Sequence, residues 1–351
     1  MRILLTGGGT GGHVIPNLAI IEDLKSREIA EIKYVGSKKG PEKKLIEKAG
    51  IDFEGITCGK LRRYFSFENF ADFFRVPVGI FQAYKILKGY QPVVIFSKGG
   101  YVSFPVVVVA WKLKIPVILH ESDVVPGLAN KLCMKFAKKI CISFEETKLY
   151  LNKSSLKKTV FTGNPVRKSI FSGNREAGLK FTGLNQHRPV ILVMGGSQGA
   201  DQINKLVRSN LDELLKKFQI VHVVGRGNLD IGIHKTGYKQ YEYLDENLKD
   251  VYAICDLMIS RGGANSLAEM ALLKKKAVVI PLSTETSRGD QIENSRVFVR
   301  KLGWSMLSGN VSKQDFIDAV FLAFNNPTKI TGNEIPNGTD EIVQLILNKG
   351  E

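Results

Sequence analysis

The chain has 351 residues, of which 44% are hydrophobic and 24% are charged, and its formal net charge is +16. This composition is typical of a globular protein with two domains of ordinary size, and it excludes low-complexity and fibrous classes. The positive charge is uneven, because residues 1–163 hold 26 Lys and Arg against 14 Asp and Glu, whereas residues 164–351 hold 24 against 20. Such an excess suits an anionic membrane surface or a phosphorylated substrate. Nucleic acid is not expected as a partner, because no nucleic-acid-binding motif accompanies the charge.

The chain starts in a strand, so we expect no signal peptide. Its longest apolar run, residues 104–111, is too short to span a bilayer. Four cysteines are scattered without the paired spacing of metal sites. We therefore expect reduced thiols and no structural zinc.

The first element is a short apolar strand at residues 3–6, followed by five glycines around Thr10 and a helix that His13 opens. Glycines let a ligand approach the backbone, and the free N–H groups at a helix start attract anionic oxygens. The simpler interpretation is a tight strand-to-helix turn without a ligand. The spacing of Gly7, Gly9 and Gly12 also fits a dinucleotide fingerprint. An NADP-dependent oxidoreductase, with Lys38 or Lys39 at the 2′-phosphate, therefore stays open as an alternative.

Short apolar strands then alternate with amphipathic helices through both halves of the chain. Strands are expected at residues 31–36, 52–57, 92–97, 116–120, 189–194, 220–224, 257–260 and 277–281. Several of them end in glycines, and the extended turn at residues 162–165 suggests a linker. The pattern predicts an α/β protein with two doubly wound parallel sheets, in domains 1–163 and 164–337.

Residues 61–90 interrupt this rhythm with aromatic and basic side chains. Aromatic groups ringed by cations suit docking on an anionic bilayer, whereas two ordinary helices packed on the sheet would be the simpler interpretation. The candidate docking residues are Arg62, Arg63, Phe73, Phe74, Arg75, Phe81, Lys85 and Lys88.

The sequence SRGGANSLAE at residues 260–269 carries the strongest local signal. Asn265 or Ser266 is expected to cap the following helix and to leave its first N–H groups open for a diphosphate. Glu269 lies about one turn into that helix, where an acceptor-only carboxylate suits the paired hydroxyls of a ribose. Gln291, in a later polar cluster, is of the kind that binds sugar hydroxyls. Helix capping and surface polarity would explain both clusters without a ligand.

Six motifs stand in one order along the chain: GGGTGGH at 7–13, SKGGYVS at 97–103, HESDVVPGLANK at 120–131, TGNPVR at 162–167, GGSQGA at 195–200 and SRGGANSLAE at 260–269. In the combination and order of these motifs the chain resembles the MurG family, the N-acetylglucosaminyltransferases of peptidoglycan synthesis. The resemblance implies a GT-B fold, with two Rossmann-like domains facing across a cleft and a final helix at 338–351 packed on the first domain.

The resemblance also implies the substrates and the location. The donor is UDP-N-acetylglucosamine (UDP-GlcNAc), bound mostly by the second domain, and no cofactor is required. The acceptor is lipid I, undecaprenyl-diphospho-MurNAc-pentapeptide, at the cytoplasmic face of the bacterial plasma membrane. Other cell-wall synthesis proteins are implied as further partners.

Residue roles follow from the same resemblance. Ala264, Asn265 and Ser266 would hold the diphosphate, Glu269 the ribose and Gln291 the transferred sugar. The remaining donor contacts implied are Thr10, Gly11, Gly12, Arg167, Ser197 and, through its backbone at uracil, Leu244. Asp123 stands where many relatives have a sugar-binding asparagine, and a carboxylate can accept from a hydroxyl but cannot donate.

The implied reaction inverts the anomeric carbon as the C4 hydroxyl of the acceptor sugar displaces UDP. Helix N–H groups can stabilise the leaving diphosphate, so we expect no metal. His13 at a helix start is the first candidate for the base, and Glu121 is the reserve. His13 acting only as a phosphate ligand remains open, as does a membrane-surface sensor that binds the sugar nucleotide without catalysis.

Overall fold

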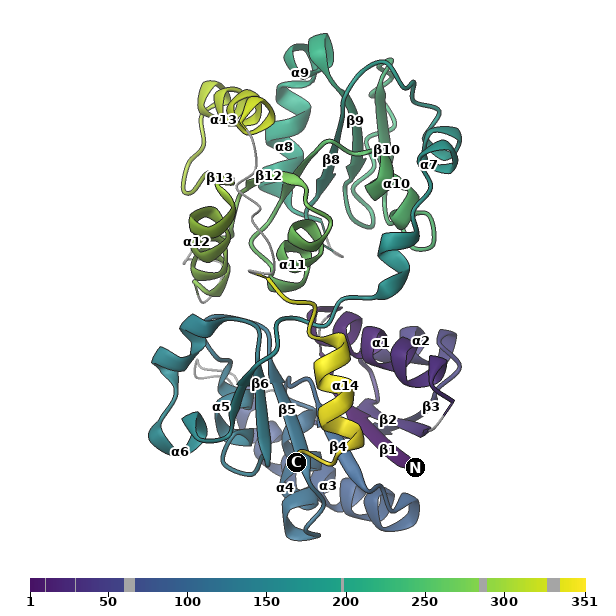
Figure 1. The fold of residues 1–351 in the computed structure, drawn as a ribbon, viewed down its shortest axis with the longest axis vertical. Coiled ribbons are helices and arrows are strands. Elements are labelled where there is room, and N and C mark those ends of the chain that lie inside the picture. The colour runs from purple at the N-terminus through teal and green to yellow at the C-terminus, as the bar shows by residue number, and fades with distance from the viewer. Residues whose placement is uncertain (10, 29, 60–66, 197–198, 284–288, 327–334) are drawn as a thin grey trace. The chain divides into compact units, whose positions relative to one another are not determined.

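The computed structural model describes residues 1–351 except 10, 29, 60–66, 197–198, 284–288 and 327–334, and it describes side chains for neither 11 nor 67–74. The chain forms two compact units. Unit 1 contains Met1–Arg167 and Pro336–Glu351, and unit 2 contains Lys168–Ile335. Each unit consists of a parallel sheet with helices on its faces (Figure 1).

Unit 1 is built on a seven-stranded sheet in the order β3-β2-β1-β4-β5-β6-β7, with all neighbours parallel. Its strands are β1 (Arg2–Thr6), β2 (Glu31–Ser37), β3 (Asp52–Ile56), β4 (Val94–Ser97), β5 (Val117–Glu121), β6 (Lys139–Ile142) and β7 (Thr159–Phe161). Thr6 is in register with Val35 of β2 and Ser97 of β4. The loops after these strands therefore start at the same edge of the sheet.

Helices cover both faces of this sheet, which explains why its strands are apolar without alternation. The helices are α1 (Gly11–Ser26), α2 (Glu42–Lys48), α3 (Phe67–Tyr90), α4 (Ser103–Lys112), α5 (Leu128–Cys133), the 3-10 helix η1 (Glu145–Tyr150), α6 (Lys153–Leu156) and α14 (Thr339–Leu347). Leu4 of β1 packs in the core with Leu87 of α3, whereas Ile3 and Leu5 face the core formed with α1, α2 and α14. Each such side chain contributes about 1.5–3 kcal/mol by its burial.

Unit 2 repeats the plan with a six-stranded parallel sheet in the order β10-β9-β8-β11-β12-β13. Its strands are β8 (Val190–Met194), β9 (Gln219–Val223), β10 (Tyr238–Tyr241), β11 (Leu257–Ser260), β12 (Lys276–Val279) and β13 (Ser305–Met306). Its helices are the 3-10 helix η2 (Lys168–Ser172), α7 (Arg175–Thr182), α8 (Asp201–Ser209), α9 (Leu211–Lys217), α10 (Leu248–Ile254), α11 (Ala264–Leu272), α12 (Asp290–Leu302) and α13 (Lys313–Asn325). Ile191 and Val193 of β8 pack in one core with Val207 of α8, Leu214 of α9 and Phe316 of α13.

The predicted fold class is confirmed, since both sheets are parallel and each belongs to its own unit. Four strands were not predicted, namely β6, β7, β10 and β13. The interpretation of residues 61–90 as two helices is wrong, because Phe67–Tyr90 is a single helix of 24 residues that continues through Pro77.

The chain passes from unit 1 to unit 2 after Arg167, not after residue 163. Val166 stays with unit 1 because its N–H group donates to Asn337 Oδ1 and Thr339 Oγ1, both at 3.1 Å. Asn337 Nδ2 donates back to the Val166 carbonyl at 3.0 Å. These bonds join the outgoing segment to the returning one, and α14 then packs against α1 within unit 1.

Candidate active site

Each sheet has one place where the strand order reverses, between β1 and β4 in unit 1 and between β8 and β11 in unit 2. Ligands of open parallel sheets bind at the carboxyl ends of the strands beside such a point. In unit 1 the loops there are residues 7–9 and 98–100, and in unit 2 they are residues 195–200 and 261–263. All four are the glycine-containing loops that the sequence singled out.

The two loops of unit 1 pack against each other so closely that side chains are excluded. A Cβ on Gly100 would lie 2.3 Å from the Gly8 carbonyl oxygen, and Gly100 has the positive φ of +83° that favours glycine. Tyr34 of β2 holds the first loop, because its hydroxyl donates to the Gly7 carbonyl at 2.7 Å. Asn17 of α1 donates to that hydroxyl at 2.8 Å. The glycine loop is thus fixed by buried hydrogen bonds.

One backbone donor of this loop is already bound to a carboxylate of the protein, which the sequence did not suggest. Glu42 of α2 is fully buried, and its Oε2 accepts from the Gly9 N–H group at 3.3 Å. Its Oε1 accepts from the Ser37 N–H group at 2.7 Å. An anion at this loop would therefore rely on the first N–H groups of α1 and on neighbouring cations rather than on the Gly9 N–H group.

The structure places His13 in the first turn of α1, beside the second glycine loop. A Cβ on Gly100 would lie 3.2 Å from His13 Cδ2, so the imidazole contacts that loop. His13 is half-buried, and its carbonyl accepts from Asn17 Nδ2 at 3.2 Å. Of the predicted donor loop, Gly11 begins the helix, Gly12 is exposed, and Thr10 lies outside the described residues.

Glu121, the other candidate base, ends β5 as a buried carboxylate with three hydrogen bonds. Its Oε1 accepts from the Asp123 N–H group at 3.0 Å, and its Oε2 accepts from the Gly127 N–H group at 3.1 Å and Asn130 Nδ2 at 2.8 Å. Its exposure is 3%. Such a carboxylate organises the loop that carries Asp123, which is itself half-buried.

The ammonium group of Lys98 lies between the first glycine loop and the loop that carries Asp123, and sequence reasoning did not single it out. Lys98 is 1% exposed, and its Nζ donates to Ser122 Oγ. Burial lowers the pKa of Lys98 to about 8, against the charges of Glu121 and Asp123, which raise it. The motif Ser-Lys-Gly-Gly was visible in the sequence, but a lysine after a strand is ordinarily expected in solvent.

In unit 2 the helix α11 opens beside the switch point, with a different cap from the one expected. The N-cap is Gly263 in extended conformation, and α11 begins at Ala264. The prediction that Asn265 or Ser266 caps the helix is therefore wrong, because both lie within its first turn and leave the capping position to a glycine. Both side chains are half-buried. Ser197, from the loop after β8, lies outside the described residues.

Glu269 lies within α11, and Gln291 lies beside the loop that precedes this helix. Glu269 is 7% exposed, and its Oε2 accepts from the Tyr252 hydroxyl of α10 at 2.8 Å. Gln291 lies in the first turn of α12, and its side-chain Oε1 accepts from the Leu282 N–H group at 3.3 Å. Its main-chain carbonyl oxygen would lie 2.3 Å from a Cβ on Gly262. The structure thus places Gln291 beside the loop that precedes α11, and it adds Tyr252 as a partner of Glu269 within that helix.

Two arginines complete the candidate set. Arg261 begins the second glycine loop of unit 2, and its half-buried side chain reaches the first loop. A Cβ on Gly196 would lie 2.8 Å from one of its terminal nitrogens. Burial lowers the pKa of Arg261. Its Nε, like that of the predicted Arg167, is buried without a hydrogen-bond partner in the part of the chain that the structure describes. Arg167 ends unit 1, and Leu244 is buried in the loop between β10 and α10.

The basic aromatic stretch presents one exposed stripe along α3. Val78 is 47% and Phe81 58% exposed, and Arg75, Lys85 and Lys88 are exposed as well. These positions recur at helical spacing on one face. Lys85 Nζ lies 4.6 Å from the centre of the Phe81 ring. The opposite face packs in the core, while Arg62, Arg63 and the side chains of Phe73 and Phe74 lie outside what is described.

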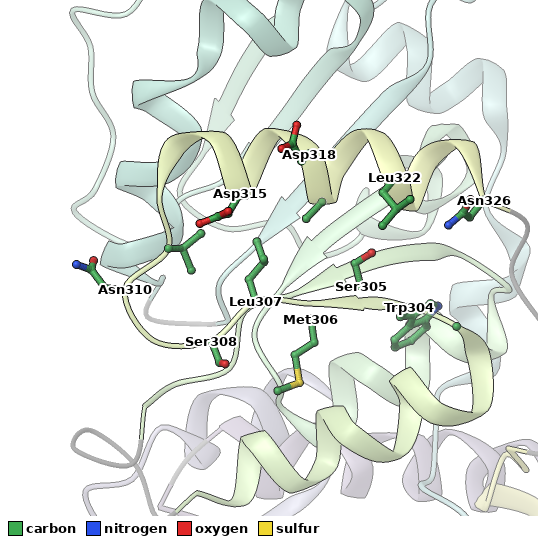
Figure 2. Close-up of a pocket in the computed structure, with 13 residues that line it drawn as sticks. Trp304, Ser305, Met306, Leu307, Ser308, Asn310, Asp315, Asp318, Leu322 and Asn326 are labelled. Carbon is green, nitrogen blue, oxygen red and sulfur yellow. The ribbon is translucent and has the colours of Figure 1, made fainter.

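Unit 2 also has a cavity of about 580 Å³ between β13 and α13. Figure 2 shows Asp315, Asp318 and Leu322 of α13 on one side and Leu307 and Ser305 on the other. None of the predicted site residues lines this cavity. It is therefore separate from the switch point of this unit.

No helix among the described residues has the length and apolarity needed to cross a bilayer. No group of three or more His, Cys, Asp or Glu side chains among them could hold a metal ion.

Known families cover most of the chain. The glycosyltransferase family 28 N-terminal domain matches residues 3–142, and the glycosyltransferase family 28 C-terminal domain matches residues 190–337. The chain belongs to glycosyltransferase family 28. A Bacillus cereus protein that is 48% identical, over 100% of this chain and 99% of its own length, is named UDP-N-acetylglucosamine--N-acetylmuramyl-(pentapeptide) pyrophosphoryl-undecaprenol N-acetylglucosamine transferase 2. A Lachnoclostridium phytofermentans transferase named likewise, without the number, is 48% identical over 98% of this chain and 97% of its own. These family 28 relatives confirm the resemblance to the MurG family and set the oxidoreductase alternative aside.

Solved structures agree on the fold. MurG from Acinetobacter baumannii has a TM-score of 0.68 at 22% identity, with 99% of both chains covered. A UDP-GlcNAc 2-epimerase from Methanocaldococcus jannaschii has a TM-score of 0.67 at 15% identity, covering 99% of this family 28 chain and 100% of the epimerase. Because MurG and an epimerase share this fold at low identity, the likeness supports the fold alone.

Proposed function

We propose that the protein transfers N-acetylglucosamine from UDP-GlcNAc to the C4 hydroxyl of the MurNAc sugar of lipid I and so forms lipid II. The observation that carries this proposal is the 48% identity, over essentially the whole chain, to relatives named as that transferase. The placement of Arg261 and Gln291 at the glycine loops beside α11, and of Glu269 within that helix, supports it.

The donor binds at the switch point of unit 2. The N–H groups at the start of α11, in Ala264, Asn265 and Ser266, receive the diphosphate, because they have no intrahelical acceptor and point along the positive end of the helix dipole. Glu269 accepts from the ribose hydroxyls, and the Tyr252 hydroxyl holds its other oxygen in place. Gln291 binds hydroxyls of the transferred sugar.

Each of the remaining contacts keeps the role that the family resemblance implies. Arg167 and Ser197 bind the donor, Leu244 meets uracil through its backbone, and Asp123 accepts from a sugar hydroxyl. Thr10, Gly11 and Gly12 are donor contacts in the same resemblance.

The reaction needs stabilisation of the leaving group and a base. As the C4 hydroxyl attacks the anomeric carbon, negative charge grows on the diphosphate of UDP, and the fixed N–H donors of α11 stabilise it without reorganisation. Arg261 adds a positive charge beside the same loop. The attacking hydroxyl loses its proton to His13, because this imidazole is half-buried in the first turn of α1 and contacts the second glycine loop. Glu121 is the poorer base, since its oxygens already accept three hydrogen bonds.

The acceptor is lipid-linked, and we propose that unit 1 meets it by lying on the cytoplasmic face of the bacterial plasma membrane. The exposed stripe of α3 supports this, because it combines Val78 and Phe81 with Arg75, Lys85 and Lys88. Cations attract an anionic leaflet and aromatic side chains partition into its interface. Other cell-wall synthesis proteins would be met at the same membrane.

The deciding experiment measures transfer of radiolabelled N-acetylglucosamine from UDP-GlcNAc to a lipid I analogue with purified full-length protein. Formation of the β-linked disaccharide product supports the proposal. UDP-GlcNAc binding without any transfer would instead support a sensor of sugar nucleotides.

A further inference from the structure

A lysine ammonium group lies inside unit 1, where charges are rare. Lys98 follows β4 directly, is 1% exposed, and lies against the glycine loop, since a Cβ on Gly7 would be 3.1 Å from its own Cβ. Removing an ammonium group from water is costly unless polar partners surround it. A neutral apolar side chain of similar length would fill the same space without that cost. The charge itself therefore needs a reason.

Hydrogen bonds connect this ammonium group to the loop after β5. Nζ donates to Ser122 Oγ, and the Ser122 hydroxyl donates to Asn164 Oδ1 at 3.0 Å. Ser143 of the segment after β6 also donates to that oxygen, at 3.4 Å. Asn164 pairs with Asn337 through the backbone, where the chain returns to unit 1. Ser122 is thus held from two sides, by Lys98 and by the paired crossing segments.

Ser122 stands between two carboxylates, and both act on the lysine. The charges of Glu121 and Asp123 oppose the effect of burial on the pKa of Lys98. His120 precedes them, and burial together with the charge of Lys98 lowers its pKa well below the ordinary value. This imidazole is therefore neutral at pH 7, and the positive charge facing the two carboxylates is that of Lys98.

Two further titratable groups belong to neighbouring elements. His13 of α1 contacts Gly100, and Glu42 of α2 contacts Gly8 and binds the Gly9 N–H group. They adjoin the glycine loops rather than Ser122. The hydrogen bond from Lys98 links the glycine loops to Ser122 in the loop that carries Asp123. Asn130 makes a second link, because it packs against Gly99 and donates to Glu121 Oε2 at 2.8 Å.

We propose that Lys98 is a positioning residue of the transfer reaction: its buried ammonium group holds Ser122 and thereby places the Asp123 carboxylate for a sugar hydroxyl. This inference rests on the proposed function, in which Asp123 binds sugar. It assigns Lys98 no contact with substrate. Loss of the charge would leave the fold intact but remove one of the two hydrogen bonds that hold the Ser122 side chain beside Asp123.

The test measures the pH dependence of kcat/KM for transfer, between about pH 6 and pH 10, in the wild type, Lys98→Met, Lys98→Arg and Ser122→Ala. Loss of a hydrogen bond from a charged donor predicts that Lys98→Met lowers kcat/KM about 10- to 100-fold at pH 7. Wild-type activity should fall above pH 8, where Lys98 loses its proton, and this decline should be absent from Lys98→Met. Lys98→Arg should recover part of the activity and retain it to higher pH, because a guanidinium group stays protonated.

Controls separate the possible failures. UDP affinity, measured by calorimetry, should be unchanged in every variant because unit 2 provides that site, and exposed Lys112→Met should behave as the wild type. A wild type that binds UDP but transfers nothing would overturn the proposed function instead. Transfer by Lys98→Met within about twofold of the wild type at every pH would overturn this inference. If Lys98→Met does not fold, Ser122→Ala decides: a matching loss supports the inference, and unchanged transfer overturns it.

Discussion

The two units carry similar short sequences, SKGG and SRGG, at the same place in their sheets, but the cation lies differently in each. Ser97 ends β4 and is followed by Lys98 and two glycines, and Ser260 ends β11 and is followed by Arg261 and two glycines. Each strand lies beside the reversal of strand order. The lysine is buried and bound to Ser122, whereas the arginine is half-buried with its Nε without a partner among the described residues.

This difference indicates that one motif serves two purposes. In unit 1 the cation points inward and organises a loop, and Glu42 already occupies the Gly9 N–H group. In unit 2 the guanidinium lies beside Gly196 at the start of α11, where an incoming diphosphate can meet it. We therefore expect unit 1 variants to affect turnover and unit 2 variants to affect donor affinity.

The largest effect is expected at His13. Removing the general base in His13→Ala should lower kcat by about 10²- to 10⁴-fold, while the Kd of UDP-GlcNAc stays within about twofold. Exposed His234→Ala in unit 2 is the matched control and should transfer normally. Rapid-quench transfer assays and calorimetry on the same preparations check both parts. A His13→Ala protein with normal kcat would exclude this imidazole as the base.

The second prediction concerns stability and separates positioning from simple packing. The pKa of Lys98 is lowered from 10.5 to about 8, so its protonated form costs the folded state free energy below pH 8. Lys98→Met should therefore raise the free energy of unfolding at pH 7, by up to about 3 kcal/mol. The gain should shrink as pH rises from 8 towards 10.5, because the wild-type lysine is then neutral in the fold. Urea unfolding of the wild type and the variant, at pH 7 and again near pH 10, measures the difference in the free energy of unfolding. A variant that is destabilised at pH 7 would contradict this account.

In unit 2, Glu269→Ala should weaken UDP-GlcNAc binding by roughly 1–3 kcal/mol, since the ribose hydroxyls lose their acceptor. Tyr252→Phe should weaken it less, by about 0.5–1.5 kcal/mol, because it removes only the bond that steadies the carboxylate. Calorimetry on folded variants gives both values. Unchanged affinity in Glu269→Ala would refute the ribose assignment.

The sequence predicted the parts of this site that depend on local pattern. Apolar runs ending in glycine located β1, β4, β8 and β11, because buried parallel strands are uniformly apolar. It missed β13, which has two residues, and β10, whose sequence YKQY has no apolar run. Parallel pairing to a neighbour, not local preference, forms these strands.

The buried charges could not be predicted in the same way. Lys98 and Glu42 read as surface residues, and their burial depends on partners far away in the sequence, such as Ser122 and the Gly9 N–H group. The Gly263 cap was missed for a related reason. Asn265 and Ser266 are strong capping types, but the close packing of α12 on Gly262 fixes where the chain turns.

A smaller effect is expected at the membrane, again in unit 1 alone. Each lysine near an anionic leaflet contributes about 1 kcal/mol, so Lys85→Gln with Lys88→Gln should reduce binding to anionic vesicles about 10- to 100-fold at low salt. The difference should diminish with salt, and the part due to Phe81 should remain. The matched control is Lys180→Gln with Lys313→Gln, on exposed helices of unit 2. Co-sedimentation that is equal for both double variants would refute docking through α3.

We expect that removing divalent cations leaves the transfer rate unchanged. This prediction tests whether the switch point of unit 2, unlike that of unit 1, supplies the positive charge for the diphosphate from the chain itself. In unit 2 the positive potential at the diphosphate comes from the N–H groups at the start of α11 and from Arg261, both fixed parts of the chain. A magnesium or manganese ion would need carboxylate oxygens beside the phosphates. The carboxylate proposed there, Glu269, has one oxygen bound to Tyr252 and the other assigned to ribose. Transfer in excess EDTA should therefore stay within about twofold of the untreated rate, whereas Arg261→Gln should lower it about tenfold or more. Strict dependence on added magnesium or manganese would mean that the leaving diphosphate is stabilised by an ion and not by the helix and its arginine.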